Sequence, residues 1–169
     1  RSSYHELHDR EEKNGKIKPE IRLSIQLQKM EDNMKQPKIL VVGSINMDFF
    51  VEGANAIPGY GESIRCRHYG YASGGKGSNQ AFAVAKQGAD VVFVGCIGDD
   101  ENGKQVKASL DKAGVNTDYL VIDPETQTGL ALMLLDDRTG RYVSYVAMGG
   151  NDRLSPDAVR KAMDENEFD

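Results

Sequence analysis

The chain has 169 residues, which suits one domain with a sizeable hydrophobic core. Its 21 Lys and Arg against 26 Asp and Glu give a net charge of −5, which argues against nucleic acid or an anionic membrane as the main partner and favours a small or neutral ligand. No segment approaches the roughly 18 to 20 apolar residues of a membrane span, and none resembles a secretory signal, so we expect a cytoplasmic protein that does not bind membranes.

Residues 1–37 are polar and contain only scattered aliphatic residues, a composition that cannot bury enough surface to offset the cost of ordering the chain. We predict a disordered segment or a leader translated by read-through, with Met30 and Met34 as candidate starts. The apolar residues within 21–27 fit a strand and a helix equally well, and we favour a short transient helix. Because the sequence begins with Arg1 and ends soon after a helix signal, we expect truncation at both ends.

A periodic pattern begins at residue 38. Residues 39–43 form a continuous aliphatic run, typical of a strand buried on both faces of a parallel sheet. Residues 91–96 form a second such run, at a distance that fits a right-handed crossover carrying an antiparallel insertion. Residues 119–122 are a third candidate for a parallel strand. The predicted fold class is therefore α/β.

Antiparallel strands are predicted in two places between and after these runs. In the first, residues 49–51 precede a turn region rich in Gly, Asn and Pro, and residues 63–71 alternate as in a half-exposed strand. In the second, residues 128–135 and 141–147 flank a turn of Asp and Gly residues and read as a hairpin. We expect these strands to have an open face.

Three helices are predicted from their start and stop signals. The first covers residues 78–87 and ends at Gly88. The second covers residues 101–112, with Asp100 as its cap. The third begins after a capping Ser155, with proline in its first turn.

The glycine-rich turn before the first helix is a candidate ligand site. From Gly74 to Asn79 it offers free backbone N–H groups and a positive helix end, which suit an oxygen-rich or anionic ligand. A tight turn without a ligand is an equally open interpretation. A nucleotide P-loop is disfavoured, because Gly77 stands where that motif has the Ser or Thr that binds Mg²⁺, and the preceding strand is not aliphatic.

Asn46 and Asp48 follow the first predicted strand, at the end where ligands gather in open α/β sheets. In an extended chain both side chains point the same way, and an amide with a carboxylate can donate to and accept from adjacent hydroxyls of a polyol. The alternative is that both satisfy local backbone groups in a turn. The two cysteines, Cys66 and Cys96, have no C-x-x-C or His neighbours, so we predict neither a disulfide framework nor a metal site.

The order and spacing of these motifs resemble the ribokinase-like carbohydrate kinase family, from about residue 38 to the end of the chain. The matching segments are Val42 to Asp48 with its N-x-D, Pro58-Gly59, Gly61-Glu62-Ser63, Gly74 to Ala81, Gly88, Gly98-Asp99-Asp100 and Gly114 to Thr117. The resemblance implies a three-layer α/β sandwich with a small β-sheet lid. Residues 38–169 would form its N-terminal part, with lid strands within 48–72 and 128–147.

The resemblance also implies a sugar site, cofactors and a partner. The sugar-binding residues that it places in this chain are Asn46, Met47, Asp48, Gly75, Lys76, Gly77, Ser78 and Asn79, with Gly149 and Asn151 added by the segment after the hairpin. A pentose such as ribose would be the substrate, ATP with Mg²⁺ and K⁺ the cofactors, and a second subunit would pair through the lid strands.

The family's catalytic Asp lies in a G-A-G-D motif that these 169 residues lack, so we expect no catalytic residue and no metal site in this chain, and no turnover. Two alternatives stay open: a kinase of another sugar or of a nucleoside, and a non-catalytic truncated product that dimerises through the lid.

Overall fold

The computed structural model describes residues 21–26, 36–54 and 57–169. The chain divides into two units, Arg1–Gln36 and Pro37–Asp169. In the first unit residues 21–26 are helical, as favoured above. The predictions of disorder, of a leader and of a start at Met30 or Met34 lie outside the described residues.

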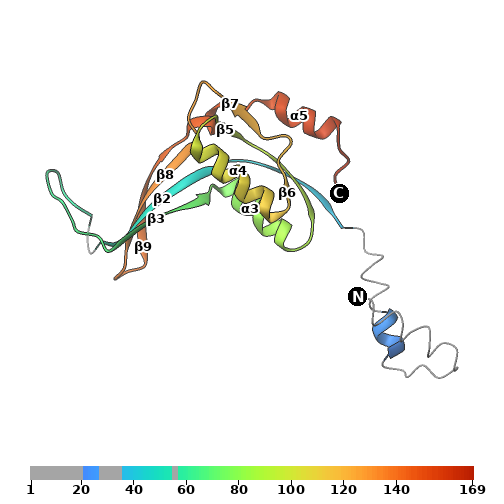
Figure 1. Cartoon of the computed structure of the whole chain (residues 1–169), viewed down its shortest axis with the longest axis horizontal. Coiled ribbons are helices and arrows are strands. Elements are labelled where there is room, and N and C mark those ends of the chain that lie inside the picture. Colours follow the sequence, from blue (N-terminus) through green and yellow to red (C-terminus); the bar gives the residue numbers. More distant parts are fainter. Residues whose placement is uncertain (1–20, 27–35, 55–56) are drawn as a thin grey trace. The chain divides into compact units, whose positions relative to one another are not determined.

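The second unit contains an α/β body built on short parallel strands (Figure 1). One sheet has the order β1 (Lys38–Val42), β4 (Asp90–Val94) and β6 (Val115–Asn116), and all of its neighbours are parallel. A second, two-stranded parallel sheet joins β5 (Cys96–Gly98) to β7 (Val121–Asp123). The predicted α/β class is confirmed.

Four helical elements accompany these sheets. They are α3 (Lys76–Lys86), α4 (Glu101–Ala113), the 3-10 helix η1 (Gly149–Arg153) and α5 (Pro156–Asp164). Helix α3 packs against β1 and β4, and α5 packs against β4. None of the helices in the described residues is long and apolar enough to cross a membrane.

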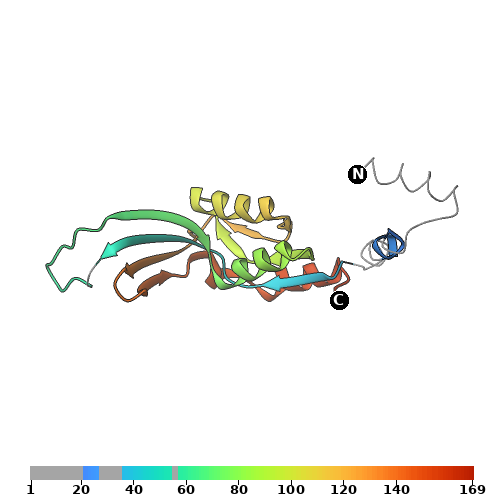
Figure 2. The same cartoon turned by 90° about the horizontal axis from the view of Figure 1, so that it is seen from below.

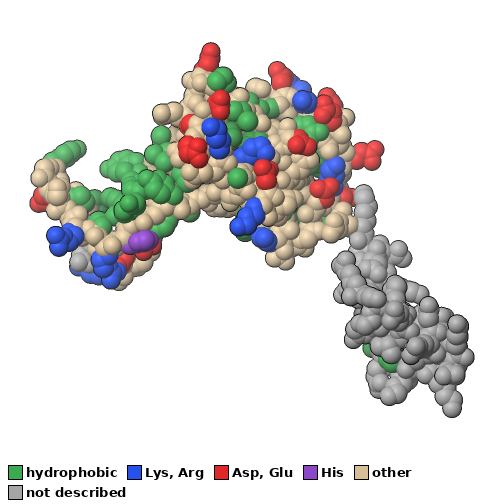
Figure 3. Space-filling model, viewed as in Figure 1, with side chains coloured by type: hydrophobic (Ala, Val, Ile, Leu, Met, Phe, Trp, Pro, Cys, Tyr) green, Lys and Arg blue, Asp and Glu red, His purple; other side chains and the backbone are tan. Residues whose placement is uncertain are grey.

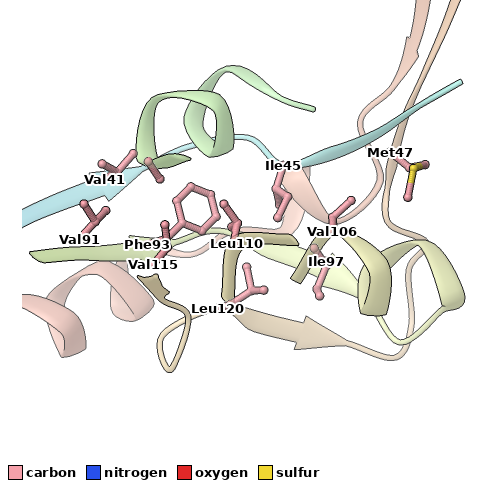
Figure 4. Close-up of a cluster of buried hydrophobic side chains, with 11 residues drawn as sticks. Val41, Ile45, Met47, Val91, Phe93, Ile97, Val106, Leu110, Val115 and Leu120 are labelled. Carbon is pink, nitrogen blue, oxygen red and sulfur yellow. The ribbon is translucent and has the colours of Figure 1, made fainter. Parts of the chain in front are cut away.

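The core of the body gathers around Phe93 of β4, which is completely buried (Figure 4). It is surrounded by side chains from the strands β1, β4, β5 and β6, from helix α4 and from two loops. These are chiefly Val41, Ile45, Val91, Ile97, Val106, Leu110, Val115 and Leu120. Burial of each such side chain contributes about 1.5–3 kcal/mol relative to leaving it in water.

One strand prediction is wrong, and another is confirmed with shifted bounds. Strand β1, at the edge of its sheet beside the central β4, is not buried on both faces: Val41 is buried, but Val42, which points to the other face, is 43% exposed. The parallel strand predicted at 119–122 is present as β7, which begins at Val121 and pairs with β5 and not with the first sheet. The strand beside β4 is instead the two-residue β6, too short for a periodicity signal.

A four-stranded sheet forms an arm that projects from the body (Figures 1 and 2). Its order is β3 (His68–Gly74), β2 (Asn46–Ala54), β8 (Gly129–Asp136) and β9 (Arg141–Ala147). The β2–β3 and β8–β9 pairs are antiparallel, whereas β2 and β8 are parallel. The hairpin predicted at 128–147 is confirmed as β8 and β9. It lies in the same sheet as the antiparallel pair β2 and β3.

Strand β3 begins later than its alternating pattern predicts. The pattern starts at Ser63, but residues 63–67 are not in a strand, and pairing begins where His68 faces Glu52. The pairing stops there because β2 leaves its regular path: Gly53 has φ 83° and its register to β8 shifts after Val51. Alternation alone therefore placed the strand too early.

Asp100 joins the start of α4 to the start of the arm. Its Oδ1 accepts hydrogen bonds from Gly103 N at 2.7 Å and from Thr128 Oγ1 at 2.7 Å, and its Oδ2 accepts from Thr128 N at 2.8 Å. Burial acts to raise the pKa of this carboxyl, but the hydrogen bonds from Thr128 and Gly103 and the charge of Lys104 together lower it. Ser155, at the same position of α5, makes no side-chain hydrogen bond to its helix.

We predict that Asp100→Ala lowers the free energy of unfolding by about 1–2 kcal/mol, whereas Ser155→Ala changes it little, because only Asp100 bonds orphan N–H groups. Urea denaturation of both variants at neutral pH measures the difference. Since the pKa of Asp100 is lowered, its contribution is lost as the pH falls below 3.8, so the gap should shrink there. Equal losses in the two variants would contradict this account.

Candidate functional site

The beginning of β2 carries two polar side chains on one face of the arm. Asn46 and Asp48 are two residues apart in a regular strand, so they share this face, which we call the site face. Asn46 is paired with Gly74 of β3 on one side and with Gly129 of β8 on the other. The neighbours of Asp48 are two alanines, Ala72 and Ala131.

These small neighbours leave room for the polar side chains. A Cβ atom on Gly74 would lie 2.0 Å from Oδ2 of Asp48, so the carboxylate rests directly over the glycine backbone. A Cβ atom on Gly129 would lie 2.3 Å from Oδ1 of Asn46. The two glycines therefore leave space that the side chains of Asp48 and Asn46 occupy, so each polar group lies directly against the backbone of a neighbouring strand.

The site face also receives Asn151 from η1. Its Nδ2 donates to Oδ1 of Asn46 at 2.8 Å, and its Oδ1 accepts from Ile45 N at 2.9 Å. Gly149, two residues earlier, has φ 53°, and a Cβ there would lie 2.3 Å from the carbonyl oxygen of Gln127. Gly149 therefore shapes the backbone beside the site and offers no side chain to a ligand.

The glycine-rich turn lies next to these residues but uses several of its N–H groups internally. Ser44 accepts from Lys76 N through Oγ at 3.1 Å and from Ser78 N through its carbonyl at 3.0 Å. The N–H of Asn79 donates to Gly75 O at 3.0 Å. The expectation that these three groups are free for a ligand is wrong. The N–H groups of Lys76 and Ser78 fix the turn to Ser44 in the loop after β1, and the N–H of Asn79 closes the first turn of α3.

The other candidates divide into buried and exposed residues. Met47 is 2% exposed and packs in the core, on the opposite face of β2 from Asp48. Ser78 is buried, and its hydroxyl donates to the carbonyls of Gly74 and Gly75. Gly77 is buried against the backbone of Gly43. Of this turn, Lys76 and Asn79 have exposed side chains.

A cavity of about 310 Å³ lies between α3 and α4, beside the turn. Asn79 lines it together with Ile45, Ser73, Phe82, Val106 and Leu110. Asp48 is not part of its wall. The structure thus brings Asp48, Asn46 and Asn151 together on the site face. Asn79 instead lines a cavity whose wall includes Ser73, which is paired with Met47 and so lies on the opposite face of the sheet from Asp48.

The electrostatic surroundings of Asp48 differ from those of two other aspartates of the body, Asp100 and Asp111. Burial raises the pKa of its carboxyl above the ordinary value of 3.8. The aspartates Asp100 and Asp111, by contrast, have lowered pKa values, since hydrogen bonds to Thr128 and Thr117 outweigh the effect of burial. A half-buried carboxylate whose pKa is not lowered by such hydrogen bonds is typical of a functional site.

The sequence analysis did not identify Gly129 or Asp100 as site residues. Gly129 makes room for the Asn46–Asn151 contact, and Asp100 fixes the residue before it, Thr128. The available signal was a glycine near the start of a predicted strand, where it has no side chain to pack. Its role depends on β2 and β8 being neighbours, which the sequence does not show.

A parallel α/β body with a β arm and an Asn-x-Asp pair at their junction defines the fold class and the site. Residues 36–168 match the sequence model of the pfkB family of carbohydrate kinases, so the chain belongs to this family of phosphotransferases. The ribokinase of Bacillus subtilis (strain 168) is 36% identical over 129 residues, which are 76% of this chain and 43% of that protein.

Two solved structures show the same likeness. The ribokinase of Cryptococcus neoformans var. grubii serotype A in complex with ADP is 39% identical, with a TM-score of 0.61 over 69% of this chain and 36% of that one. The Arabidopsis thaliana ribokinase complexed with ribose and ATP is 36% identical, with a TM-score of 0.60 over 69% of this chain and 38% of that one. The chain therefore corresponds to about two fifths of these relatives.

We predict that Asp48→Asn is more stable than the parent chain at neutral pH. Since the pKa of Asp48 is raised on folding, the native state holds this proton more tightly than the unfolded chain, and the stabilisation present at low pH is lost as the pH rises from 3.8 through the raised pKa. The variant is neutral at every pH and escapes this loss.

Urea denaturation from about pH 4 to about pH 7 tests this prediction, because the window spans the titration of a raised carboxyl. Asp157→Asn is the matched control, since the side chain of Asp157 is 85% exposed. The prediction fails if the Asp48 variant has the same stability as the parent across the whole range.

Proposed function

We propose that this chain is the sugar-binding part of an ATP-dependent carbohydrate kinase, which when complete phosphorylates D-ribose to ribose 5-phosphate. Membership of the pfkB family and likeness to three ribokinases support the substrate class. The observation that carries the proposal is the pair formed by Asn46 and Asp48 on a face flanked by glycine.

The chemistry of this pair suits a polyol. An ionised Asp48 is an acceptor only, and an amide offers both donors and an acceptor, so adjacent hydroxyls can each find a partner. Gly75, Lys76 and Asn79 would hold the sugar from the side of the turn. Because a buried polar group that loses its partner costs about 1–3 kcal/mol, such a pair would discriminate between sugars by their hydroxyls.

In this proposal the chain binds and orients the sugar, and ATP, Mg²⁺ and K⁺ would be bound elsewhere in the complete enzyme. Phosphoryl transfer needs an oriented hydroxyl, a base and positive charge around the migrating group. The described residues contain no group of three or more His, Cys, Asp or Glu that could hold a metal ion. We expect the 169-residue chain to be inactive as a kinase.

Saturation-transfer NMR on the purified chain with D-ribose tests the proposal. Ribose should receive saturation from the parent chain and from Asp157→Asn, but not from Asp48→Asn, which removes the carboxylate acceptor. Fructose and adenosine are tested in parallel, and a response to one of them alone would favour the alternative of another sugar or a nucleoside. A coupled assay that showed sustained ADP release, abolished by Asp48→Asn, would overturn the expectation of inactivity.

The proposed partner, besides the sugar, is a second copy of the chain. The face of the arm opposite the site face, here called the apolar face, carries aromatic and aliphatic side chains from all four strands: Phe49, Val51, Tyr69, Tyr71, Leu132, Leu134, Val143 and Tyr145. Tyr71 is 62% and Tyr145 73% exposed, and hydrophobic side chains gather visibly over the arm (Figure 3).

A large exposed apolar patch is typical of an interaction surface. The ring centroids of Phe49 and Tyr71 are 5.0 Å apart, so the apolar face is continuous across β2 and β3. Two identical faces can cover each other in an isologous dimer. Such a dimer is also the form that the non-catalytic alternative would take.

We predict that the chain is a dimer and that Tyr71→Glu makes it monomeric, because a charge in the middle of the apolar face would be buried without a partner. Light scattering coupled to size exclusion measures the mass against the 18.6 kDa of one chain. Ser144→Glu is the control, since Ser144 pairs with Met133 on the site face and is exposed. A monomeric parent chain, or equal effects of both variants, would contradict the proposal.

A further inference from the structure

Asn151 makes four hydrogen bonds around the start of β2 and has no polar hydrogen left for a ligand. Its Oδ1 accepts from Ile45 N at 2.9 Å, and its Nδ2 lies 3.2 Å from Ile45 O. The same Nδ2 donates to Asn46 Oδ1 at 2.8 Å and to Met148 O at 2.8 Å. The two amide protons thus have three acceptors within reach, and both are used within the fold.

We propose that Asn151 is a positioning residue, which fixes the side-chain amide of Asn46 with its oxygen turned inward and its NH₂ group turned to the substrate. This inference rests on the proposed sugar site and deepens it. It replaces the direct contact between Asn151 and the sugar that the family resemblance implies.

The hydrogen-bond donors and acceptors of Asn46 and Asp48 explain why this orientation suits a sugar. Oδ1 of Asn46 already accepts a hydrogen bond from Asn151, so the free part of the Asn46 amide is its pair of donors. Asp48, two residues away on the same face, is an acceptor. A sugar hydroxyl can therefore accept from Asn46 while it donates to Asp48. With the Asn46 amide reversed, an oxygen would stand beside a carboxylate, and both would compete for the same hydroxyl protons.

The surroundings of the two amides favour this one orientation. Asn46 is only 9% exposed, so its oxygen needs a partner inside the protein. Gly129 lies beside the contact, and a Cβ atom there would be 2.3 Å from Nδ2 of Asn151 and 2.3 Å from Oδ1 of Asn46. The glycine is therefore the residue that allows the two amides to meet.

Asn151→Asp tests the inference, because it keeps the shape of the side chain but replaces the donor by an oxygen that repels Asn46 Oδ1. Asn166→Asp is the matched control: Asn166 also donates through Nδ2 to two acceptors, Tyr119 OH at 2.9 Å and Ala162 O at 2.9 Å, but lies at the C-terminal end of the chain. Both variants should lose stability. Only Asn151→Asp should shift the side-chain amide resonances of Asn46 in ¹H–¹⁵N NMR spectra.

The second readout is ribose affinity, which should fall about tenfold in Asn151→Asp and stay within about twofold in Asn166→Asp, as expected for one lost hydrogen bond. Asn151→Ala removes the donor to Asn46 without adding a charge, and it should reproduce both effects if Asn151→Asp does not fold. The NMR readout needs no sugar, so it separates this inference from the proposed function. Unchanged Asn46 resonances in a folded Asn151 variant would overturn the inference.

Discussion

The site depends on the two glycines that face Asn46 in the neighbouring strands. In a pleated sheet the residues opposite each other project from the same face, so a side chain at Gly129 would take the space of Asn46, and one at Gly74 would take the space of Asp48. The strand is paired with both neighbours and still accommodates two polar side chains on the site face. Each glycine also weakens the sheet locally, because a glycine in a strand has no side chain to pack and loses more conformational entropy on folding than other residues.

Strand β2 carries the site because it begins in the body and continues into the arm. Ile45, just before it, is completely buried, and Met47 is 2% exposed, so Asn46 and Asp48 start from a backbone held by the core. Asn151 and Asp100 bind this junction from η1 and from the start of α4. A site on such a rigid base is positioned better than one on a loop. The outer part of the arm is held by strand pairing, by the Arg67–Asp137 ion pair and by a hydrogen bond from Gly53 N to Oδ1 of Asp137.

The sequence predicted the parts of this structure that depend on local patterns. Aliphatic runs predicted β1 and β4, the Asp100 cap predicted the start of α4, and the turn of Asp and Gly residues predicted the β8–β9 hairpin. It failed where the outcome depends on distant partners. The start of β3 is set by where β2 bends, and the donors of the glycine-rich turn are used by Ser44, 32 residues away. The role of Asn151 needs a contact across 105 residues, which no pattern of spacing reveals.

The alternation of β2 places the proposed sugar site and the apolar face of the arm on opposite sides of one strand. Even-numbered residues from Asn46 to Phe50 face the site, and odd-numbered ones from Met47 to Val51 face the core or the apolar face. A slip of one residue would turn Asp48 into the apolar layer and a phenylalanine into the site. Register must therefore be fixed at the start of the strand, and the bonds from Asn151 to both backbone groups of Ile45 do this from outside the sheet. The same asparagine that orients Asn46 thus also holds the register on which both faces depend.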